Sequence, residues 1–463
     1  MSRSAVVHAA WFTIAAGAFA AGAYLVPRSV TPDSDAAPSP RFVSVPDEGE
    51  SARTKGSATE PASLRAAGDA ASFIEKYRLG GTGGLNEQGM TDAVAEAIRE
   101  SDPVKSSLMF AMLLEELTPE NAAAASEAVR ASSSGMDAMR FLSLLSYKWG
   151  AIDGAGAVEN AQADPDGRAS TFGTMLALSG WASADPDAAL EWLSSQEDTD
   201  GRARGMWMRG LVSGLANSDP AAATALLTEM AASGDEEASN YIGSIVQQQI
   251  KLNGIQGAES WANSLSDTSL KTSAFRDIAD AYTRQDPAAA ADWIARYAGE
   301  DFATDAVSRI AGRFADTNPQ EAVKWATTLP AGEAQNRATR QAFNQWTDND
   351  PMAASEYLTK MPASASKDHA ITGLVGEIAR QDPESALAWS LSISDPELQQ
   401  RNIVENASRW FRRDQEAAAN WVAGANLPEA TQNAIVEQAS EPRGERGGPG
   451  GGDFRGRRGG GRF

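Results

Sequence analysis

Few side chains in this sequence are of the types that carry out catalysis or bind metal ions. Cysteine is absent, and His8 and His369 are the only histidines among 463 residues. Thiol chemistry, disulfides and cysteine zinc sites are therefore excluded, and a histidine-built metal site is not expected. His369 could act as a general base, but the positions 32 residues before and after it hold Arg337 and Arg401. A variable polar position of this kind favours a solvated residue or one that lines a groove.

Aspartate and tryptophan are the remaining candidates for chemistry, and both recur at regular intervals. An aspartate could bind a metal ion or transfer protons, and the 12 tryptophans could stack on sugar rings. Their regular spacing instead favours helix capping by the aspartates and core packing by ten of the tryptophans. Trp207 is the tryptophan of the expected folded region that does not follow this spacing. The glycine-rich turn at 80–84 lacks the Lys-Ser/Thr pair of a phosphate-binding loop. We therefore predict no catalytic, cofactor-binding or metal-binding residue, and no cofactor.

The sequence repeats itself with a period of 32 to 35 residues, and this self-similarity is its strongest structural signal. The recurring aspartate of each unit is position zero, which falls at Asp185, Asp219, Gly254, Asp286, Asn318, Asp350, Asp382 and Asp414. Position +4 is alanine in all eight units, position −4 is always bulky and apolar, and position +7 is tryptophan, tyrosine or leucine. The register extends back to Asp153 and, less regularly, to Thr118, which gives nine or ten units.

Each repeat position has a role in helix formation. Aspartate followed by proline starts a helix, because the carboxylate accepts hydrogen bonds from unpaired N–H groups and proline fits the first turn. Positions +4 and +7 share one face of that helix, where alanine permits close approach and tryptophan fills the adjacent space. A second helix then runs to position −4 of the next unit, for example over 334–346 or 370–378. Because such hairpins can cover their apolar faces only by stacking, we expect an all-α fold, a right- or left-curving α-solenoid of about nine or ten hairpins.

The architecture resembles tetratricopeptide-like α-solenoids. The segment Trp181-Ala182-Ser183-Ala184-Asp185-Pro186, continued to Trp192, is also similar to the Trp-Ala-x-x-Asp-Pro-x-x-Ala-x-x-Trp repeat arrays of uncharacterised exported bacterial proteins. The resemblance covers 118–425, and the unit departs from the tetratricopeptide pattern in its usual length of 32 residues and in lacking a Gly-x-x-Tyr signature. The resemblance implies binding of proteins or peptides in a groove, and it assigns no functional residue.

Both ends of the chain differ from the repeat region. Residues 9–26 carry no charge and follow Arg3, as is typical of a secretory signal peptide or a membrane anchor, and Pro27 ends the run. Small-x-small motifs at 18–20 and 21–23 leave cleavage open. We expect a signal or anchor at 1–27, a disordered linker at 28–69, an N-terminal helical cap at 70–117, the solenoid at 118–440 and a disordered Arg/Gly-rich tail at 441–463. The positive-inside rule then predicts a solenoid outside the cytoplasm, either periplasmic or anchored in the inner membrane.

The charge of the chain is acidic and unevenly distributed. The whole chain carries −22, whereas the tail carries +3 and residues 31–440 carry −27. An acidic body repels nucleic-acid phosphates and anionic membranes, so we do not expect nucleic acid as a partner. The negative charge serves either solubility or the binding of basic partners. The run 454–462 in the tail is similar to the Arg-Gly-Gly segments of RNA-binding proteins. Polyanions, RNA and the protein's own acidic body are the alternatives for that tail.

We expect a non-enzymatic scaffold or adaptor of the cell envelope, whose solenoid groove binds a protein or peptide of unknown identity. A membrane contact through 9–26 is expected if that segment is not cleaved. The first alternative is an envelope enzyme or an accessory arm acting on cell-wall material, for which little sequence remains once anchor, linker, repeats and tail are assigned. The second alternative is polyanion or RNA binding through the Arg/Gly-rich tail.

Overall fold

The computed structural model describes residues 72–78, 84–164, 167–196 and 201–440. This part of the chain is built from helices and contains no β-strand. The expected signal or anchor, the linker and the Arg/Gly-rich tail lie outside the described residues. Among the described helices, none combines the length and the apolar character that crossing a membrane requires.

Helical hairpins follow one another along the chain, as the repeat predicts. Before them come a short helix at 72–77, α3 (Glu87–Arg99) and α4 (Pro103–Glu115). The first helices of the hairpins are α5 (Pro119–Ser132), α7 (Gly154–Gln162), α9 (Pro186–Ser194), α11 (Pro220–Ala232), α14 (Pro287–Ile294), α16 (Pro319–Thr328), α18 (Pro351–Lys360), α20 (Pro383–Ser390) and α22 (Gln415–Gly424). The second helices are α6 (Gly135–Ile152), α8 (Gly167–Ala184), α10 (Gly201–Ser218), α13 (Thr268–Gln285), α15 (Thr304–Thr317), α17 (Glu333–Asn349), α19 (Ala365–Ile378), α21 (Pro396–Arg413) and α23 (Glu429–Ser440). The expected all-α solenoid of helical hairpins is therefore confirmed.

Within the described ranges, one long helix and three short 3₁₀ turns complete the element order. α12 (Ile242–Ser264) supplies both the second helix of one hairpin and the first helix of the next. The 3₁₀ turns are η1 (Glu236–Asn240), η2 (Ala295–Tyr297) and η3 (Asp301–Ala303). With α12 counted in both hairpins, the register from Thr118 onward is filled by helices without a gap in the repeat.

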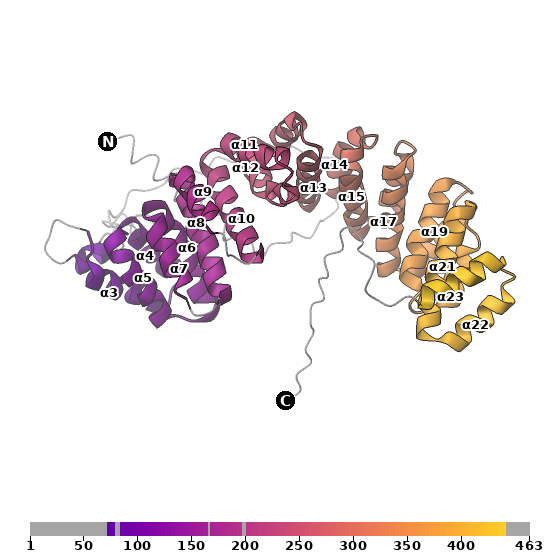
Figure 1. Ribbon diagram of the computed structural model, residues 1–463, viewed down its shortest axis with the longest axis horizontal. Helices are drawn as coiled ribbons and strands as arrows, with labels where there is room; N and C mark the ends of the chain where they lie inside the picture. The colour runs from indigo at the N-terminus through magenta and orange to yellow at the C-terminus, as the bar shows by residue number, and fades with distance from the viewer. Residues whose placement is uncertain (1–71, 79–83, 165–166, 197–200, 441–463) are drawn as a thin grey trace, which may run out of the picture. The chain divides into compact units, whose positions relative to one another are not determined.

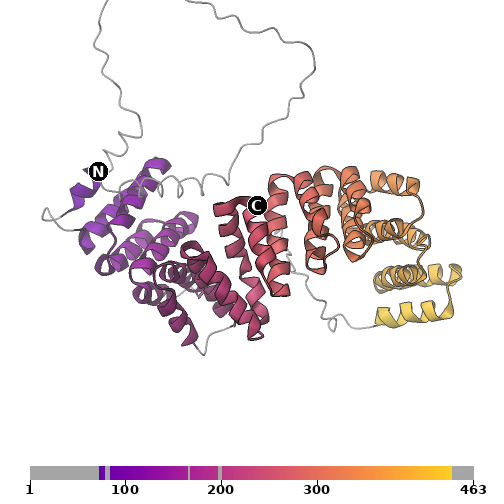
Figure 2. The ribbon, with the colours of Figure 1, turned by 90° about the horizontal axis from the view of Figure 1, so that it is seen from above.

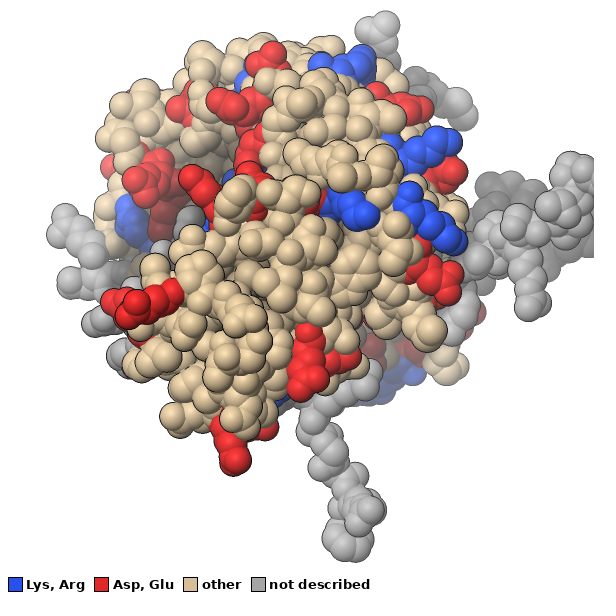
Figure 3. Space-filling model, turned by 90° about the vertical axis from the view of Figure 1, so that its right-hand side faces the viewer, with Lys and Arg blue, Asp and Glu red and all other residues tan. Residues whose placement is uncertain are grey.

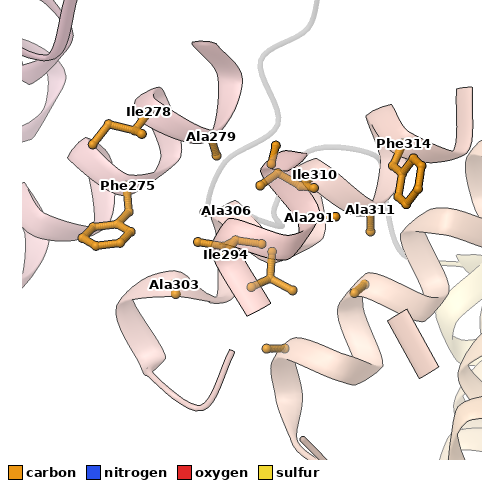
Figure 4. Close-up of a cluster of buried hydrophobic side chains, with 14 of the residues drawn as sticks. Phe275, Ile278, Ala279, Ala291, Ile294, Ala303, Ala306, Ile310, Ala311 and Phe314 are labelled. Atoms are coloured by element: carbon orange, nitrogen blue, oxygen red, sulfur yellow. The ribbon is translucent and has the colours of Figure 1, made fainter. Parts of the chain in front are cut away.

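Each hairpin packs on the hairpins before and after it. Second helices contact each other in sequence, for example α6 with α8, α8 with α10, α15 with α17 and α17 with α19. In Figures 1 and 2 the colours accordingly pass in chain order from one helix to its neighbour. Figure 4 shows one such contact region, where Phe275 and Ile278 of α13, Ile294 of α14 and Ile310 of α15 meet. The core is thus a series of contacts between neighbouring hairpins, as in other repeat arrays.

The recurring aspartate joins consecutive hairpins. Its backbone N–H donates to the carbonyl oxygen of position −4 and ends the second helix, as Asp350 N does to Trp346 O at 2.7 Å. Its carboxylate accepts from the next helix, as Asp350 Oδ1 does from Ala353 N at 3.0 Å. The same capping role is seen for Asp153, Asp185, Asp219, Asp286, Asp382 and Asp414. The predicted function of this residue as a helix cap is confirmed.

Two units depart from this pattern at position zero. The side chain of Asn318 makes no capping hydrogen bond to α16. Gly254 has a φ of 68°, in the left-handed region, and α12 passes through it with a kink. Glycine adopts this conformation without steric cost, so the chain changes direction there without a capping carboxylate.

The alanine at position +4 is buried completely, as its expected packing role requires. All eight are 0% exposed: Ala189, Ala223, Ala258, Ala290, Ala322, Ala354, Ala386 and Ala418. Position +8, one turn further along the same face, is also completely buried in seven units: Leu193, Leu227, Ala262, Ile294, Ala326, Leu358 and Ser390. The two positions four residues apart therefore form the core stripe of each first helix.

The tryptophans of the repeat pack against this core, as predicted, but most of those at +7 lie at its edge. Trp293 is buried, whereas five others remain half-buried: Trp192, Trp261, Trp325, Trp389 and Trp421. Aromatic residues at −4 and +7 of one unit contact each other, as Trp346 and Tyr357 do with ring centroids 5.2 Å apart. Trp207 is buried although it occupies neither position. Packing thus accounts for more of the tryptophans than the repeat register alone indicates.

Glycines in the second helices allow neighbouring backbones to touch. A Cβ atom added at Gly180 of α8 would lie 1.9 Å from Tyr147 O of α6, and one added at Gly373 of α19 would lie 2.3 Å from Arg340 O of α17. Glycine destabilises a helix interior by about 0.5–1 kcal/mol relative to alanine, so these positions are held by packing rather than by helix propensity. No local sequence pattern indicates this role.

Candidate functional site

The unit that starts at Asp382 breaks the repeat at two buried positions of α21. In the four preceding units, positions +20 and +24 hold alanine or aliphatic residues. These pairs are Ala274 and Ile278, Ala306 and Ile310, Ala338 and Ala342, and Ala370 and Leu374, all of them 0% exposed. In α21 the equivalent residues are Asn402 and Asn406, each 5% exposed. Two carboxamides therefore stand where the repeat otherwise places hydrocarbon.

The hydrogen bonds of these asparagines leave an acceptor without a partner. Asn406 Nδ2 donates to Asn402 O at 2.8 Å, and its buried Oδ1 receives no hydrogen bond within the described residues. Asn402 Nδ2 donates to Leu398 O at 2.9 Å and to Thr372 Oγ1 of α19 at 3.2 Å. A buried carbonyl oxygen without a donor costs about 1–3 kcal/mol. Local rules of folding are broken most often where function requires it, so this pair marks a candidate site.

A polar groove of about 260 Å³ lies among α17, α19 and α21 and is lined in part by both asparagines. The two glycines of α19 that line it differ in their surroundings. Gly373 touches the backbone of α17, whereas a Cβ atom at Gly376 would meet only Asn344 Nδ2, at 3.7 Å. Gly373 is therefore needed for helix packing. Gly376 is not, and its missing side chain leaves space in the groove.

Two arginines on the outer helices of this group line the same groove. Arg409 of α21 pairs with Glu405 one turn earlier, at 2.6 Å. Arg340 of α17 forms no ion pair and no side-chain hydrogen bond within the described residues. Asn344 Nδ2 donates to Glu377 Oε1 of α19 at 2.5 Å, which fixes a third carboxamide at the groove. Elsewhere the charges are mixed, and Figure 3 shows a face on which acidic and basic side chains are interspersed among uncharged ones.

His369, the one histidine in the described residues, lies on α19 but does not line the groove. It is half-buried, and burial lowers the pKa of its imidazole, with a further lowering from the nearby Arg340. No carboxylate is hydrogen-bonded to its ring in the part of the chain that the structure describes, so it lacks the orienting partner of a typical general base. The adjacent Asp368 is buried and accepts hydrogen bonds from Ser394 N and Asp395 N at 2.9 and 3.1 Å, which is a structural role.

A second hollow of about 380 Å³ lies beside α12 and α14 and includes Tyr282 and Trp293. Because two aromatic residues line this hollow, it is the candidate location for stacking of a tryptophan on a sugar ring. Trp293 is only 5% exposed, however, and its ring packs against Phe275 with centroids 5.8 Å apart. Glu259 is engaged by Tyr297, whose hydroxyl donates to Oε1 at 2.5 Å. The aromatic faces are therefore occupied by the core, and the hollow offers little to a ligand.

The groove of α17, α19 and α21 offers groups that bind rather than groups that break bonds. Carboxamide oxygens accept hydrogen bonds, and a guanidinium binds carboxylates through paired N–H donors. No group of three or more histidine, aspartate or glutamate side chains that could hold a metal ion occurs in the described ranges. These groups can accept and donate hydrogen bonds, and Arg340 can pair with a carboxylate.

None of these groove residues was identified by sequence reasoning, although a signal for two of them is present. When the units are aligned on position zero, positions +20 and +24 are apolar in the four units from Gly254 to Asp350. Both positions are asparagine in the next unit, which starts at Asp382. An interruption of an apolar position by a polar residue is visible without a structure. The contribution of Gly376 and Arg340 is not, because it depends on how α17 and α21 lie beside α19.

The chain was also compared with known proteins. No protein-family model matches it, and no curated protein is significantly similar to it in sequence. The all-α solenoid architecture is shown by the structure. Membership of the tetratricopeptide-like solenoids or of the exported repeat arrays stays a prediction from the sequence.

Proposed function

We propose that the protein is a non-enzymatic scaffold or adaptor that holds a segment of another polypeptide in the groove of α17, α19 and α21. The observation that carries the proposal is the buried pair Asn402 and Asn406, at positions where the repeat otherwise uses hydrocarbon. A polypeptide backbone presents N–H donors and C=O acceptors, and carboxamides complement both. Asn406 lines the groove, and a bound N–H group would supply the donor that its Oδ1 lacks if the carboxamide turns toward the ligand.

The carboxamides that line the groove favour an extended segment over a helix. An extended strand exposes the backbone N–H groups that a helix uses internally, so those groups can pair with the side chains of the groove.

We place this activity in the cell envelope, on the basis of the sequence alone. The uncharged run 9–26 after Arg3 is typical of an export signal or membrane anchor. The location is tested by fractionating cells that produce the protein and probing membrane, periplasmic and cytoplasmic fractions. Recovery in the cytoplasmic fraction alone would contradict it.

Affinity capture with matched glycine variants tests the binding function. The immobilised full chain is exposed to envelope extract in three forms: wild type, Gly376→Leu and Gly424→Leu. Gly376→Leu fills the groove, whereas a Cβ atom added at Gly424 of α22 meets no other atom within 4 Å. We expect a partner retained by the wild type and by Gly424→Leu, and lost from Gly376→Leu.

Two results would contradict the proposal. One is retention of the same proteins by all three forms, which would place binding elsewhere. The other is no retained partner together with turnover of cell-wall material by the purified protein, which would favour the enzyme alternative. Equal melting temperatures of the two glycine variants would show that both remain folded.

A further inference from the structure

We infer that the groove selects an acidic peptide segment, whose carboxylate pairs with Arg340 while a backbone N–H donates to Asn406. This inference rests on the proposed function and names the chemistry of its ligand. The groove brings together an arginine without a carboxylate partner and a buried acceptor without a donor. An acidic residue in an extended peptide supplies both missing partners.

Arg340 is an unpaired arginine that lines the groove, in a chain with an excess of negative charge. Acidic residues outnumber basic ones by 62 to 40. Several arginines on the same series of helices are paired: Arg337 contacts both Asp305 and Glu333, Arg309 and Arg313 contact Asp280, and Arg409 contacts Glu405. Arg284 of α13 and Arg401 of α21 are not paired among the described residues, but neither of them lines the groove. Arg340 is exposed at the groove and has no such partner among the described residues. A guanidinium is suited to a carboxylate because its N–H donors match both oxygens.

The surrounding charge argues for a short acidic segment rather than a polyanion. Residues 31–440 carry −27, so a nucleic acid or another long polyanion would be repelled along most of its length. A single carboxylate placed at Arg340 meets that repulsion only locally. Glu405, which also lines the groove, is already paired with Arg409 and so adds little negative charge there.

Defined peptides test the inference by fluorescence anisotropy with the full chain. The probes are two labelled peptides of equal length, one alternating glutamate with serine and the other alternating glutamine with serine. The wild type should bind the glutamate peptide about two- to fivefold more tightly, because an ion pair with an exposed arginine contributes on that order. Arg340→Gln should remove this preference, and added salt should reduce it. Arg99→Gln on α3 changes the net charge equally at an exposed site and should keep the preference.

The outcomes separate this inference from the proposed function. If both peptides bind equally and Gly376→Leu abolishes both, the groove binds peptides but does not select acid, and the inference is wrong. If neither peptide binds, or if Gly376→Leu leaves binding unchanged, the proposed function fails with it. An acidic preference that survives Arg340→Gln, or a single-stranded oligonucleotide that competes as well as the glutamate peptide, would also overturn the inference.

Discussion

Replacing Asn406 by leucine should make the protein more stable. Leucine branches at Cγ as asparagine does, so the substitution exchanges Oδ1 and Nδ2 for two methyl groups with the same branching. The repeat already places leucine at the equivalent position of α19, where Leu374 is 0% exposed. The variant therefore asks whether Asn406 is present for stability or for another purpose.

The expected magnitude follows from the contacts of the carboxamide. Removing a buried Oδ1 without a donor returns about 1–3 kcal/mol. Leucine also has a better helix propensity than asparagine, by roughly 0.5 kcal/mol. The lost hydrogen bond from Nδ2 to Asn402 O, of length 2.8 Å, offsets about 0.5–1.5 kcal/mol of this gain. The net expectation is a stabilisation of roughly 1.5 kcal/mol.

Urea unfolding followed by circular dichroism measures this change. A higher midpoint at an unchanged slope would report the gain in folding free energy. Asn344→Leu is the matched control, because Asn344 is half-buried and its Nδ2 is satisfied by Glu377, so no gain is expected there. A loss of stability in Asn406→Leu would mean that Oδ1 is satisfied in solution and that Asn406 has a structural role. That result would remove the main support for the groove as a functional site.

Three further predictions concern the packing, the capping and the pH dependence of the solenoid. The Gly373→Ala variant should be less stable than the Gly376→Ala variant by about 1–3 kcal/mol in urea unfolding. Both substitutions raise helix propensity, but only the first places a Cβ atom 2.3 Å from a carbonyl oxygen. Equal stabilities of the two variants would show that α17 and α19 are not in close contact. Asp350→Ala should lower the free energy of unfolding by about 1 kcal/mol, and Asn318→Ala by clearly less, because only the Asp350 side chain caps its helix. Equal losses of stability in melting experiments would refute this capping role. Burial raises the pKa of Asp277 in the folded protein, because the buried carboxyl group favours its protonated form. The stability that this group contributes is therefore fully present below the pKa of the unfolded chain, near 3.9, and is lost as the pH rises through the pKa of the folded protein. Asp277→Asn should therefore stabilise the protein at pH 7, with a difference that shrinks toward pH 4, and a destabilised variant at pH 7 would contradict this sign.

The elements of the fold that depend on local sequence could be predicted. An aspartate before proline sets a helix start through its own carboxylate and backbone, so Asp350 and its equivalents act as expected without regard to the neighbouring unit. Alanine at +4 was also recognised, because its invariance among eight units indicates a close contact. Both signals lie within a single hairpin.

Features that arise between hairpins could not be predicted in the same way. Gly373 is explained only by the carbonyl of Arg340 one unit earlier, and no local pattern shows that approach. The sequence also suggested +7 as a core position, whereas the +4 and +8 stripe is the buried one and most +7 rings lie at its edge. The groove combines residues of three helices, so its position follows from stacking and not from a motif.

Site-specific photo-crosslinking in the producing cells tests most directly whether the groove holds another polypeptide. The photoreactive amino acid p-benzoylphenylalanine is placed at position 341, in the lining of the groove, or at position 352, which is exposed on α18. The account predicts an adduct of higher mass with another protein after irradiation of the chain labelled at 341, and none from the chain labelled at 352. No adduct from 341, or the same adducts from both positions, would contradict binding in the groove.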